Sequence, residues 1–317
     1  MKNTLLSILT VIFTIFLLEI FLIYNHYTPN YQTYDFDING TINIVNDNPN
    51  DFYTDKRDKT VLLGDSFTVN KVCAHNDKDF VSIIQNKLND ENTAYYNFAS
   101  LADSPPEYLN ITNHLKNDIK SLIVVLYYND IFIGQKTCKS MRNLEKFGYG
   151  LPNKCNEIYT TGIDNSNNNI IKKIDNFLEF KVKTYRLIKE ASVNIPYISS
   201  FFNRKSWTNL YLDVQSDENI FFIKILKDIK DLSILHNFDL TFTYFPDVVY
   251  LEADNPSIDD WNSFINQAKK YEIIIADPWN FFMTNKDASN MSWSLVDDHP
   301  NCKANSIMAK YLMKEVL

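Results

Sequence analysis

Short apolar runs alternate with amphipathic patterns along the chain after residue 58. The runs are rich in β-branched and aromatic residues, as expected of strands buried on both faces of a sheet. They fall at residues 60–63, 94–99, 121–127, 240–245 and 272–276. Helical patterns lie at residues 80–88, 107–119, 220–235, 259–270 and 305–316. This alternation predicts an α/β fold with a parallel five-stranded sheet and helices on both of its faces.

The alternation is interrupted between residues 131 and 216. This stretch contains Gly148 and Gly150, two of the cysteines, an asparagine run at 165–169 and a long helical pattern at 170–191. We interpret it as an insertion after the third strand. Connections at strand ends often carry function, so the insertion could be a lid or a partner surface. A purely structural elaboration explains it equally well.

The N-terminus carries an apolar run at residues 4–24, about the 20 residues that a helix needs to cross a bilayer. Lys2 precedes the run, and no lysine or arginine follows until Lys56. By the positive-inside rule, the N-terminus stays in the cytoplasm and the rest of the chain is exported to a periplasmic or other extracytoplasmic space. We therefore expect a single transmembrane signal anchor at residues 1–27 and a polar stalk at 28–58. A cleaved signal peptide is the alternative, although no small-residue cleavage site follows the run.

Composition narrows the class of protein. The chain has 317 residues, a net charge of −8 and a pI near 5.2, without a dense basic stripe. Nucleic-acid binders present clustered Lys and Arg to phosphates, so nucleic acid is not an expected partner.

Four cysteines suit an oxidising compartment, and the lack of a C-x-x-C spacing argues against a zinc or thioredoxin-like site. They are Cys73, Cys138, Cys155 and Cys302. Three pairings are possible; Cys138 and Cys155 are closest in sequence, which would leave Cys73 and Cys302 to pair with each other. Four buried thiols are the alternative.

Ser66 directly follows the first predicted strand in the sequence "VLLGDSFT". Sites in parallel α/β sheets form at the carboxyl ends of the strands, where this serine would project. With a base nearby it could act as a nucleophile. The ordinary alternative is a serine that caps the next helix.

His299 lies in "LVDDHPN", just before the last helical pattern. A catalytic imidazole needs a carboxylate to fix its tautomer, and Asp297 stands two residues before it. An ordinary helix start also explains the aspartates and Pro300. A metal site is a weaker alternative, because no second histidine or carboxylate cluster is near in sequence.

Two more polar segments follow predicted strands. The second strand leads into "NFASLADSPPEYL", and the third into "YYND", which contains Asn129. A tetrahedral oxyanion needs two or three preorganised donors. The backbone N–H groups of Ser66 and of the second segment, with the Asn129 amide, could supply them.

These four segments, in this order, resemble the four blocks of the SGNH/GDSL hydrolase family. "GDSFT" is similar to block I, "NFASLADS" to block II, "YYND" to block III and "DDHPN" to block V. The resemblance covers roughly residues 58–317 and implies a flavodoxin-like three-layer α/β/α domain at 59–317. The anchor, "GDSFT" and "D-x-H-P-N" together are similar to exported members associated with acylation of surface glycans.

The resemblance implies a role for each site residue. Ser66 would attack an ester carbonyl, His299 would be the general base, and Asp297 would orient the imidazole. Ser66, Ala102 and Asn129 would form the oxyanion hole. Ala102 stands where block II carries glycine, which keeps the backbone N–H but disfavours a positive φ.

The expected function is therefore a membrane-anchored serine esterase or O-acyltransferase, acting on ester-linked acyl groups, such as acetyl, of exported carbohydrate. It would need no cofactor or metal. An inactive SGNH-fold binding or assembly factor for surface glycans is the alternative, supported by Ala102 and the insertion. A lipase with the insertion as its lid is a third possibility.

Overall fold

The structure is a computed structural model, and it describes part of the chain. The described residues are 14, 35–36, 42–43, 49–69, 73, 78–100, 103–127, 130, 141, 144, 217–248, 251, 259–285, 291–294 and 297–317. The predicted anchor at 4–24, apart from Thr14, and the predicted insertion, apart from Met141 and Leu144, lie outside them. So do Ala102, Asn129, Cys138 and Cys155.

The chain divides into two compact units, and nearly all described residues belong to the larger one. That unit comprises Tyr31–Cys155, Trp207–Ser294 and Asp298–Leu317. No helix within the described ranges is long and apolar enough to cross a membrane. The anchor at residues 4–24 stays a prediction.

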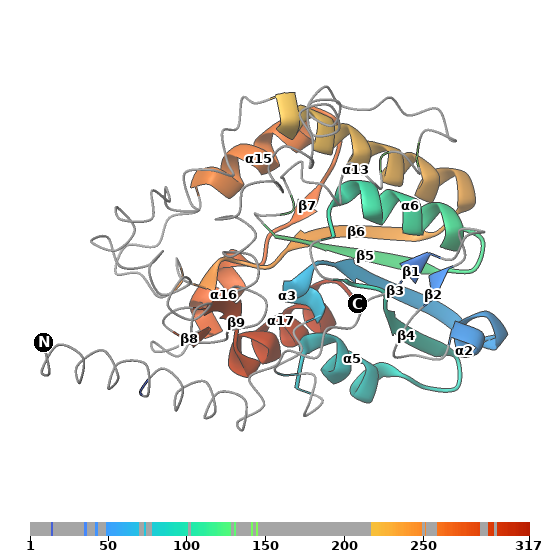
Figure 1. Cartoon of the computed structure of the whole chain (residues 1–317), viewed down its shortest axis with the longest axis horizontal. Helices are drawn as coiled ribbons and strands as arrows, with labels where there is room; N and C mark the ends of the chain where they lie inside the picture. The colour runs from blue at the N-terminus through green and yellow to red at the C-terminus, as the bar shows by residue number, and fades with distance from the viewer. Residues whose placement is uncertain are drawn as a thin grey trace, which may run out of the picture. The chain divides into compact units, whose positions relative to one another are not determined.

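Five parallel strands form the central sheet (Figure 1). They are β3 (Asp58–Gly64), β4 (Thr93–Asn97), β5 (Ser121–Leu126), β6 (Asp239–Tyr244) and β7 (Ile275–Ala276). Their spatial order is β4-β3-β5-β6-β7, so the first strand of the sheet lies between the second and the third. This is one of the common orders of doubly wound α/β sheets. The predicted α/β fold with a parallel five-stranded sheet is confirmed.

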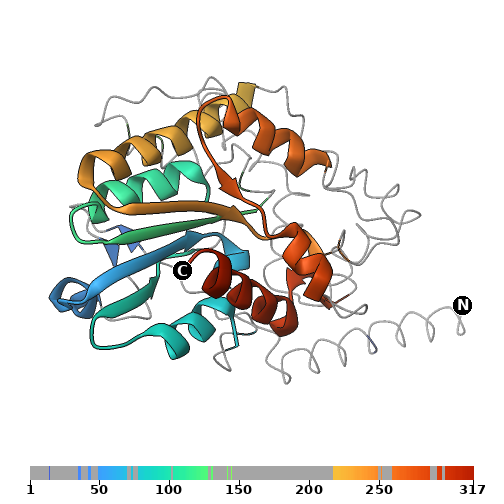
Figure 2. The ribbon, with the colours of Figure 1, turned by 180° about the vertical axis from the view of Figure 1, so that it is seen from behind.

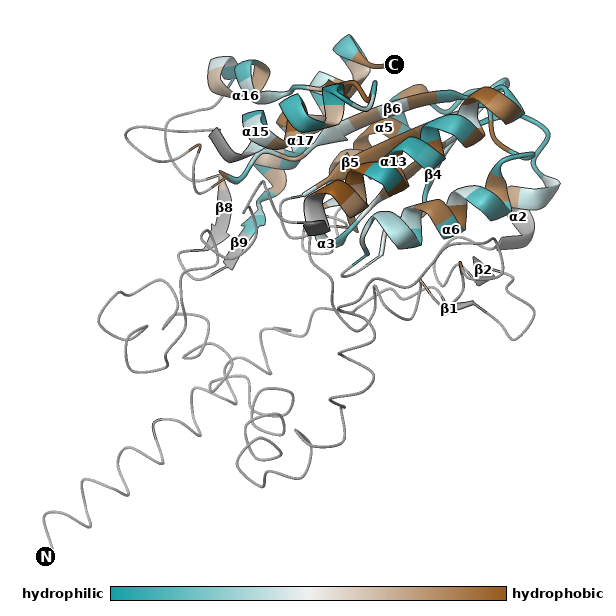
Figure 3. Cartoon of the chain, turned by 90° about the horizontal axis from the view of Figure 1, so that it is seen from above, coloured by the Kyte–Doolittle hydropathy of each residue, from teal (hydrophilic) through white to brown (hydrophobic). Residues whose placement is uncertain are grey.

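Helices cover both faces of the sheet. Figures 1 and 2 show α6 and α13 on one face, and α5 and α17 on the other. These helices are α5 (Phe80–Leu88), α6 (Pro105–Leu115), α13 (Asp217–His236) and α17 (Cys302–Glu315). Figure 3 shows hydrophobic colour along the inner strands, whereas α6 and α13 also carry hydrophilic positions. Four further elements follow β6 along the chain: α15 (Asp259–Lys269), α16 (Trp279–Asn285), β8 (Ser292–Ser294) and β9 (Asp297–Pro300).

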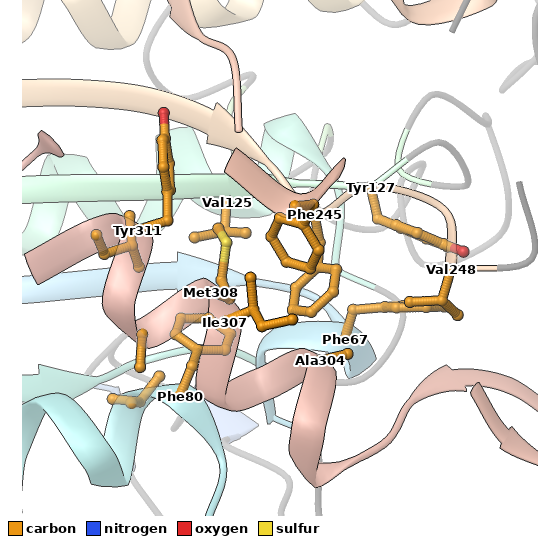
Figure 4. Packing of buried hydrophobic residues seen from close by; sticks show 14 of the residues in the cluster. Phe67, Phe80, Val125, Tyr127, Phe245, Val248, Ala304, Ile307, Met308 and Tyr311 are labelled. Atoms are coloured by element: carbon orange, nitrogen blue, oxygen red, sulfur yellow. The ribbon is translucent and has the colours of Figure 1, made fainter. Parts of the chain in front are cut away.

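A hydrophobic core fills the space between the sheet and the helices α5 and α17. Val125 of β5 and Phe245, which directly follows β6, meet Phe80 of α5 and Met308 of α17 in this core (Figure 4). All four side chains are almost completely buried. This packing holds α17, the C-terminal helix, against α5 and the middle of the sheet.

Capping residues explain where the helices begin. Asn301 caps α17, since its side-chain oxygen accepts hydrogen bonds from the backbone N–H groups of Lys303 and Ala304. Ser104 caps α6, and the Glu107 carboxylate accepts from the Ser104 backbone N–H at 3.0 Å. Both helices therefore begin two or three residues before the predicted positions 305 and 107.

The predicted stalk contains secondary structure of its own. A two-stranded antiparallel pair, β1 (Asp35–Phe36) and β2 (Ile42–Asn43), precedes α2 (Pro49–Thr54). Phe52 of α2 is buried, with its ring 4.9 Å from that of Tyr96 and 5.1 Å from that of Phe98. The packed part of the chain therefore begins before residue 59.

Candidate active site

Ser66 lies at the carboxyl end of β3, where the strand turns into the one-turn helix α3 (Ser66–Val69). Gly64 makes this turn possible. A Cβ at Gly64 would lie 2.6 Å from the Thr68 Cβ and 3.0 Å from the Val125 carbonyl oxygen. The absence of a side chain at Gly64 thus lets α3 fold back tightly onto β3 and β5.

Asp65 fixes the start of this helix from a buried position. Its Oδ1 accepts a hydrogen bond from the Phe67 N–H at 2.9 Å, and its carbonyl oxygen accepts from the N–H groups of Thr68 and Val69. Its Oδ2 lies 3.4 Å from the Ser66 Oγ. Ser66 is only partly buried.

His299 of β9 faces Ser66. Its Nε2 lies 3.0 Å from the Ser66 Oγ, although the two residues are 233 positions apart in sequence. With Nε2 unprotonated, the hydroxyl donates to the ring nitrogen, which is the contact that activates a serine. The structure thus brings together two of the sequence-predicted site residues at hydrogen-bonding distance.

Stacked rings hold the imidazole. The Phe67 ring lies between those of Tyr127 and His299, with centroid distances of 3.4 Å and 4.5 Å. The planes of Phe67 and His299 differ by only 15°. Figure 4 shows Phe67 and Tyr127 on the side of the hydrophobic core where α17 begins, the side of Ala304. This stacking restricts rotation of the imidazole, and no sequence pattern had pointed to it.

The segment after His299 is anchored to α5 and to Cys73, which follows Ser66 by seven residues. Asn305 is fully buried; its Nδ2 donates to the carbonyl oxygen of Pro300 at 3.3 Å, and its Oδ1 accepts from the Phe80 N–H at 3.2 Å. Cys302 forms a disulfide with Cys73, with Cα atoms 5.2 Å apart. This is one of the three pairings that the sequence left open.

The remaining predicted residues lie partly or wholly outside the described part of the chain. Asp297 is the first residue of β9, and its side chain is not described. Ala102 and Asn129 are not described either. Residues next to both positions are described. The Ser100 N–H donates to the Gly64 carbonyl oxygen at 3.1 Å, and Asp130 is hydrogen-bonded to Tyr127 at the end of β5. Residues next to both positions therefore lie at the same sheet edge as Ser66.

Behind this edge lies a buried carboxyl group that the sequence reasoning missed. The Asp130 Oδ2 accepts hydrogen bonds from the Tyr127 N–H at 2.7 Å and from the Tyr108 hydroxyl at 3.1 Å. Burial raises the pKa of Asp130 well above its usual range, and the nearby charge of Asp65 raises it further. Both effects favour the protonated form of Asp130 over its carboxylate.

Metal binding has no support among the described residues, which contain no group of three or more His, Cys, Asp or Glu side chains arranged to hold an ion.

Comparisons with known proteins give limited information. No model of a known protein family matches the chain, and no curated protein matches it. Among solved structures, an acetyl xylan esterase is similar at 10% identity, with a TM-score of 0.42, over 82% of this chain and all of the other. A member of the lipolytic G-D-S-L family from Veillonella parvula is similar at 11% identity, with a TM-score of 0.41, over 81% of this chain and 97% of the other. At this level of similarity neither structure carries an argument about this chain.

Proposed function

We propose that the chain is a serine esterase or O-acyltransferase of the SGNH/GDSL type, with Ser66 as the nucleophile. The observation that supports this most is the 3.0 Å contact between the Ser66 Oγ and the His299 Nε2 at the carboxyl edge of a parallel sheet. A capping serine would have no need of an imidazole at this distance. The stacked Phe67 ring, which orients the imidazole, also supports a base held for proton transfer.

In this proposal His299 removes the proton as Ser66 Oγ attacks the carbonyl carbon of an ester. The C–O bond to the leaving alcohol then breaks, the imidazolium returns the proton to that alcohol, and an acyl-serine remains. A hydroxyl group of the acceptor then attacks the acyl-serine while His299 takes its proton. The bond to the Ser66 Oγ breaks, His299 returns the proton to Ser66, and the acylated acceptor leaves. Asp297 orients the imidazole, and the N–H groups of Ser66 and Ala102 with the Asn129 amide stabilise the oxyanion.

Water as the acceptor gives an esterase, and a sugar hydroxyl gives an O-acyltransferase. We propose acylated, exported carbohydrate as the substrate, on the basis of the sequence resemblance and the predicted anchor.

Hydrolysis of p-nitrophenyl acetate tests this proposal, with Ser66→Ala and His299→Ala compared with wild type. Each substitution should lower kcat/KM by about a thousandfold or more, since both residues act on the same proton. His236→Ala is the matched control, because His236 is a half-buried histidine whose Nδ1 lies 2.9 Å from the Asn117 Oδ1, outside the site. Equal rates in wild type and Ser66→Ala would contradict the proposal and favour the glycan-binding alternative.

We also propose that residues 4–24 anchor the protein in a membrane, with the α/β domain on the exported side. The support is the length of the apolar run and the position of Lys2 before it. The full-length chain should remain in the membrane pellet after alkaline carbonate extraction, and a protease added outside should degrade the domain. Release of intact protein by carbonate would contradict the anchor.

A further inference from the structure

Each of the three segments proposed to supply an oxyanion donor contains a buried aspartate directly beside the donor position. Asp65 precedes Ser66, Asp103 follows position 102, and Asp130 follows position 129. Exposure of these aspartates is only 1%, 2% and 1%. Buried carboxyl groups are costly unless they have partners, so three of them behind one sheet edge need an explanation.

Tyr108 of α6 lies beside two of these aspartates, Asp103 and Asp130. It is fully buried, and burial raises the pKa of its hydroxyl well above the usual range. Negative charge on Asp130, Asp65 or Asp103 raises that pKa further.

The contacts of the hydroxyl reach two of the segments directly. The Tyr108 hydroxyl donates to the Asp130 Oδ2 at 3.1 Å, and it lies 3.5 Å from the Asp103 carbonyl oxygen. The same Asp130 Oδ2 accepts from the Tyr127 N–H, while the Asp130 N–H donates to the Tyr127 carbonyl oxygen at 3.0 Å. Asp130 is thereby clamped to the end of β5, one peptide bond from position 129.

Backbone contacts connect the other two segments. The Gly64 carbonyl oxygen, just before Asp65, accepts from the Ser100 N–H at 3.1 Å, and the Ser100 carbonyl oxygen accepts from the Asp103 N–H at 3.3 Å. The first segment is thus connected through the second to Tyr108 and on to the third.

We propose that Tyr108 is a positioning residue, whose hydroxyl holds the segments after β3, β4 and β5 in the mutual arrangement that an oxyanion hole requires. This inference rests on the proposed function for its catalytic meaning. Oxyanion donors must be in place before charge develops, and a displacement of about 1 Å can cost about a hundredfold in rate. A fixed phenol behind the donors supplies that rigidity without touching the substrate.

Tyr108→Phe tests the proposal, because it removes the hydroxyl and keeps the ring. Tyr244→Phe is the matched control: Tyr244 is also fully buried, and its hydroxyl donates to an aspartate, Asp277, on the β6 side of the sheet.

The first measurement is hydrogen exchange by mass spectrometry, which needs no activity. Tyr108→Phe should speed exchange about fivefold or more in peptides covering 64–69, 99–104 and 127–131, and leave α17 unchanged. Tyr244→Phe should leave all three peptides unchanged. Faster exchange confined to α6, or the same change in both variants, would overturn the proposal. If Tyr108→Phe does not fold, Asp130→Ala must speed exchange in the same three peptides, and a change confined to 127–131 would overturn it.

The second measurement is the kinetics of p-nitrophenyl acetate hydrolysis. Tyr108→Phe should lower kcat by about tenfold to a hundredfold with KM within about twofold, since a displaced oxyanion hole weakens the transition state and not substrate binding. An unchanged kcat in an active protein would overturn the positioning role. A wild type without activity would instead refute the proposed function, and the exchange measurement would still decide whether Tyr108 holds the three segments.

Discussion

Ser66 and His299 are held by separate local contacts that converge on one hydrogen bond. Asp65 fixes the backbone around Ser66, and the Phe67 ring restricts the imidazole. Because Phe67 belongs to the same short helix as Ser66, the segment that carries the serine also orients the His299 imidazole. The geometry of the pair therefore depends on few residues, most of them buried.

Asp130 gives the stability of the protein a characteristic pH dependence. Its folded pKa is raised above the unfolded value of about 3.9, so the folded state keeps a proton that the unfolded chain releases. The associated stability is fully present below the unfolded pKa and is lost as pH rises through the folded pKa. Each pH unit in that window costs up to about 1.4 kcal/mol.

Urea unfolding of wild type and Asp130→Asn between pH 4 and pH 8 tests this. Asparagine cannot ionise, and its side-chain oxygen can still accept from the Tyr127 N–H. The free energy of unfolding of the wild type should therefore fall with rising pH more steeply than that of the variant. Burial also raises the pKa of Asp79, but Asp79 is present in both proteins and cancels. Parallel pH profiles would show that Asp130 is ionised in the folded state.

At the scale of elements, the segment from β9 to α17 connects the histidine to the rest of the domain. Asn301 caps the helix, Asn305 binds the first residue of α5, and the disulfide joins Cys302 to Cys73. Cys73 follows Ser66 by seven residues, and Cys302 follows His299 by three. The disulfide therefore links the segment after Ser66 to the segment after His299.

The disulfide should stabilise the fold more than it affects the chemistry. It connects residues 229 positions apart, and removing it frees a long loop in the unfolded chain. Cys73→Ala with Cys302→Ala should lower the free energy of unfolding by about 2–5 kcal/mol, measured by urea titration. The kcat should stay within about tenfold of wild type, because Asn305 and the core still hold α17. Unchanged stability would show that the bridge does not form in the folded protein.

Local patterns predicted the elements well where burial is periodic, and failed where long-range contacts decide. All five strands of the sheet were predicted, but the last shrank to Ile275–Ala276, since Glu272 has a positive φ of 61° in the turn after α15. Helix α2 was missed because the burial of Phe52 depends on contacts with Tyr96 and Phe98, more than 40 residues away in sequence. The starts of α6 and α17 could have been predicted from their capping residues, Ser104 and Asn301.

At the scale of the molecule, the parallel sheet explains how separated motifs meet. Successive parallel strands end at one edge, so residues that follow β3 and β5 lie near each other. This is why Ser66 could be proposed from sequence. His299 lies in β9, outside the central sheet, so it could be paired with Ser66 only through a resemblance. Tyr108 could not be found that way, because nothing in its own segment shows that its hydroxyl bonds to Asp130, 22 residues away. The one available signal was an aspartate beside each donor position.

The most direct test of the central claim is fluorophosphonate labelling of the full-length protein, followed by peptide mapping of the adduct. A serine activated by an imidazole reacts with this reagent, whereas a capping serine does not. We predict one adduct on Ser66 that is absent from Ser66→Ala and His299→Ala and retained in His236→Ala. A folded wild-type protein that remains unlabelled, or an adduct that persists in His299→Ala, would contradict the account of Ser66 as a nucleophile activated by His299.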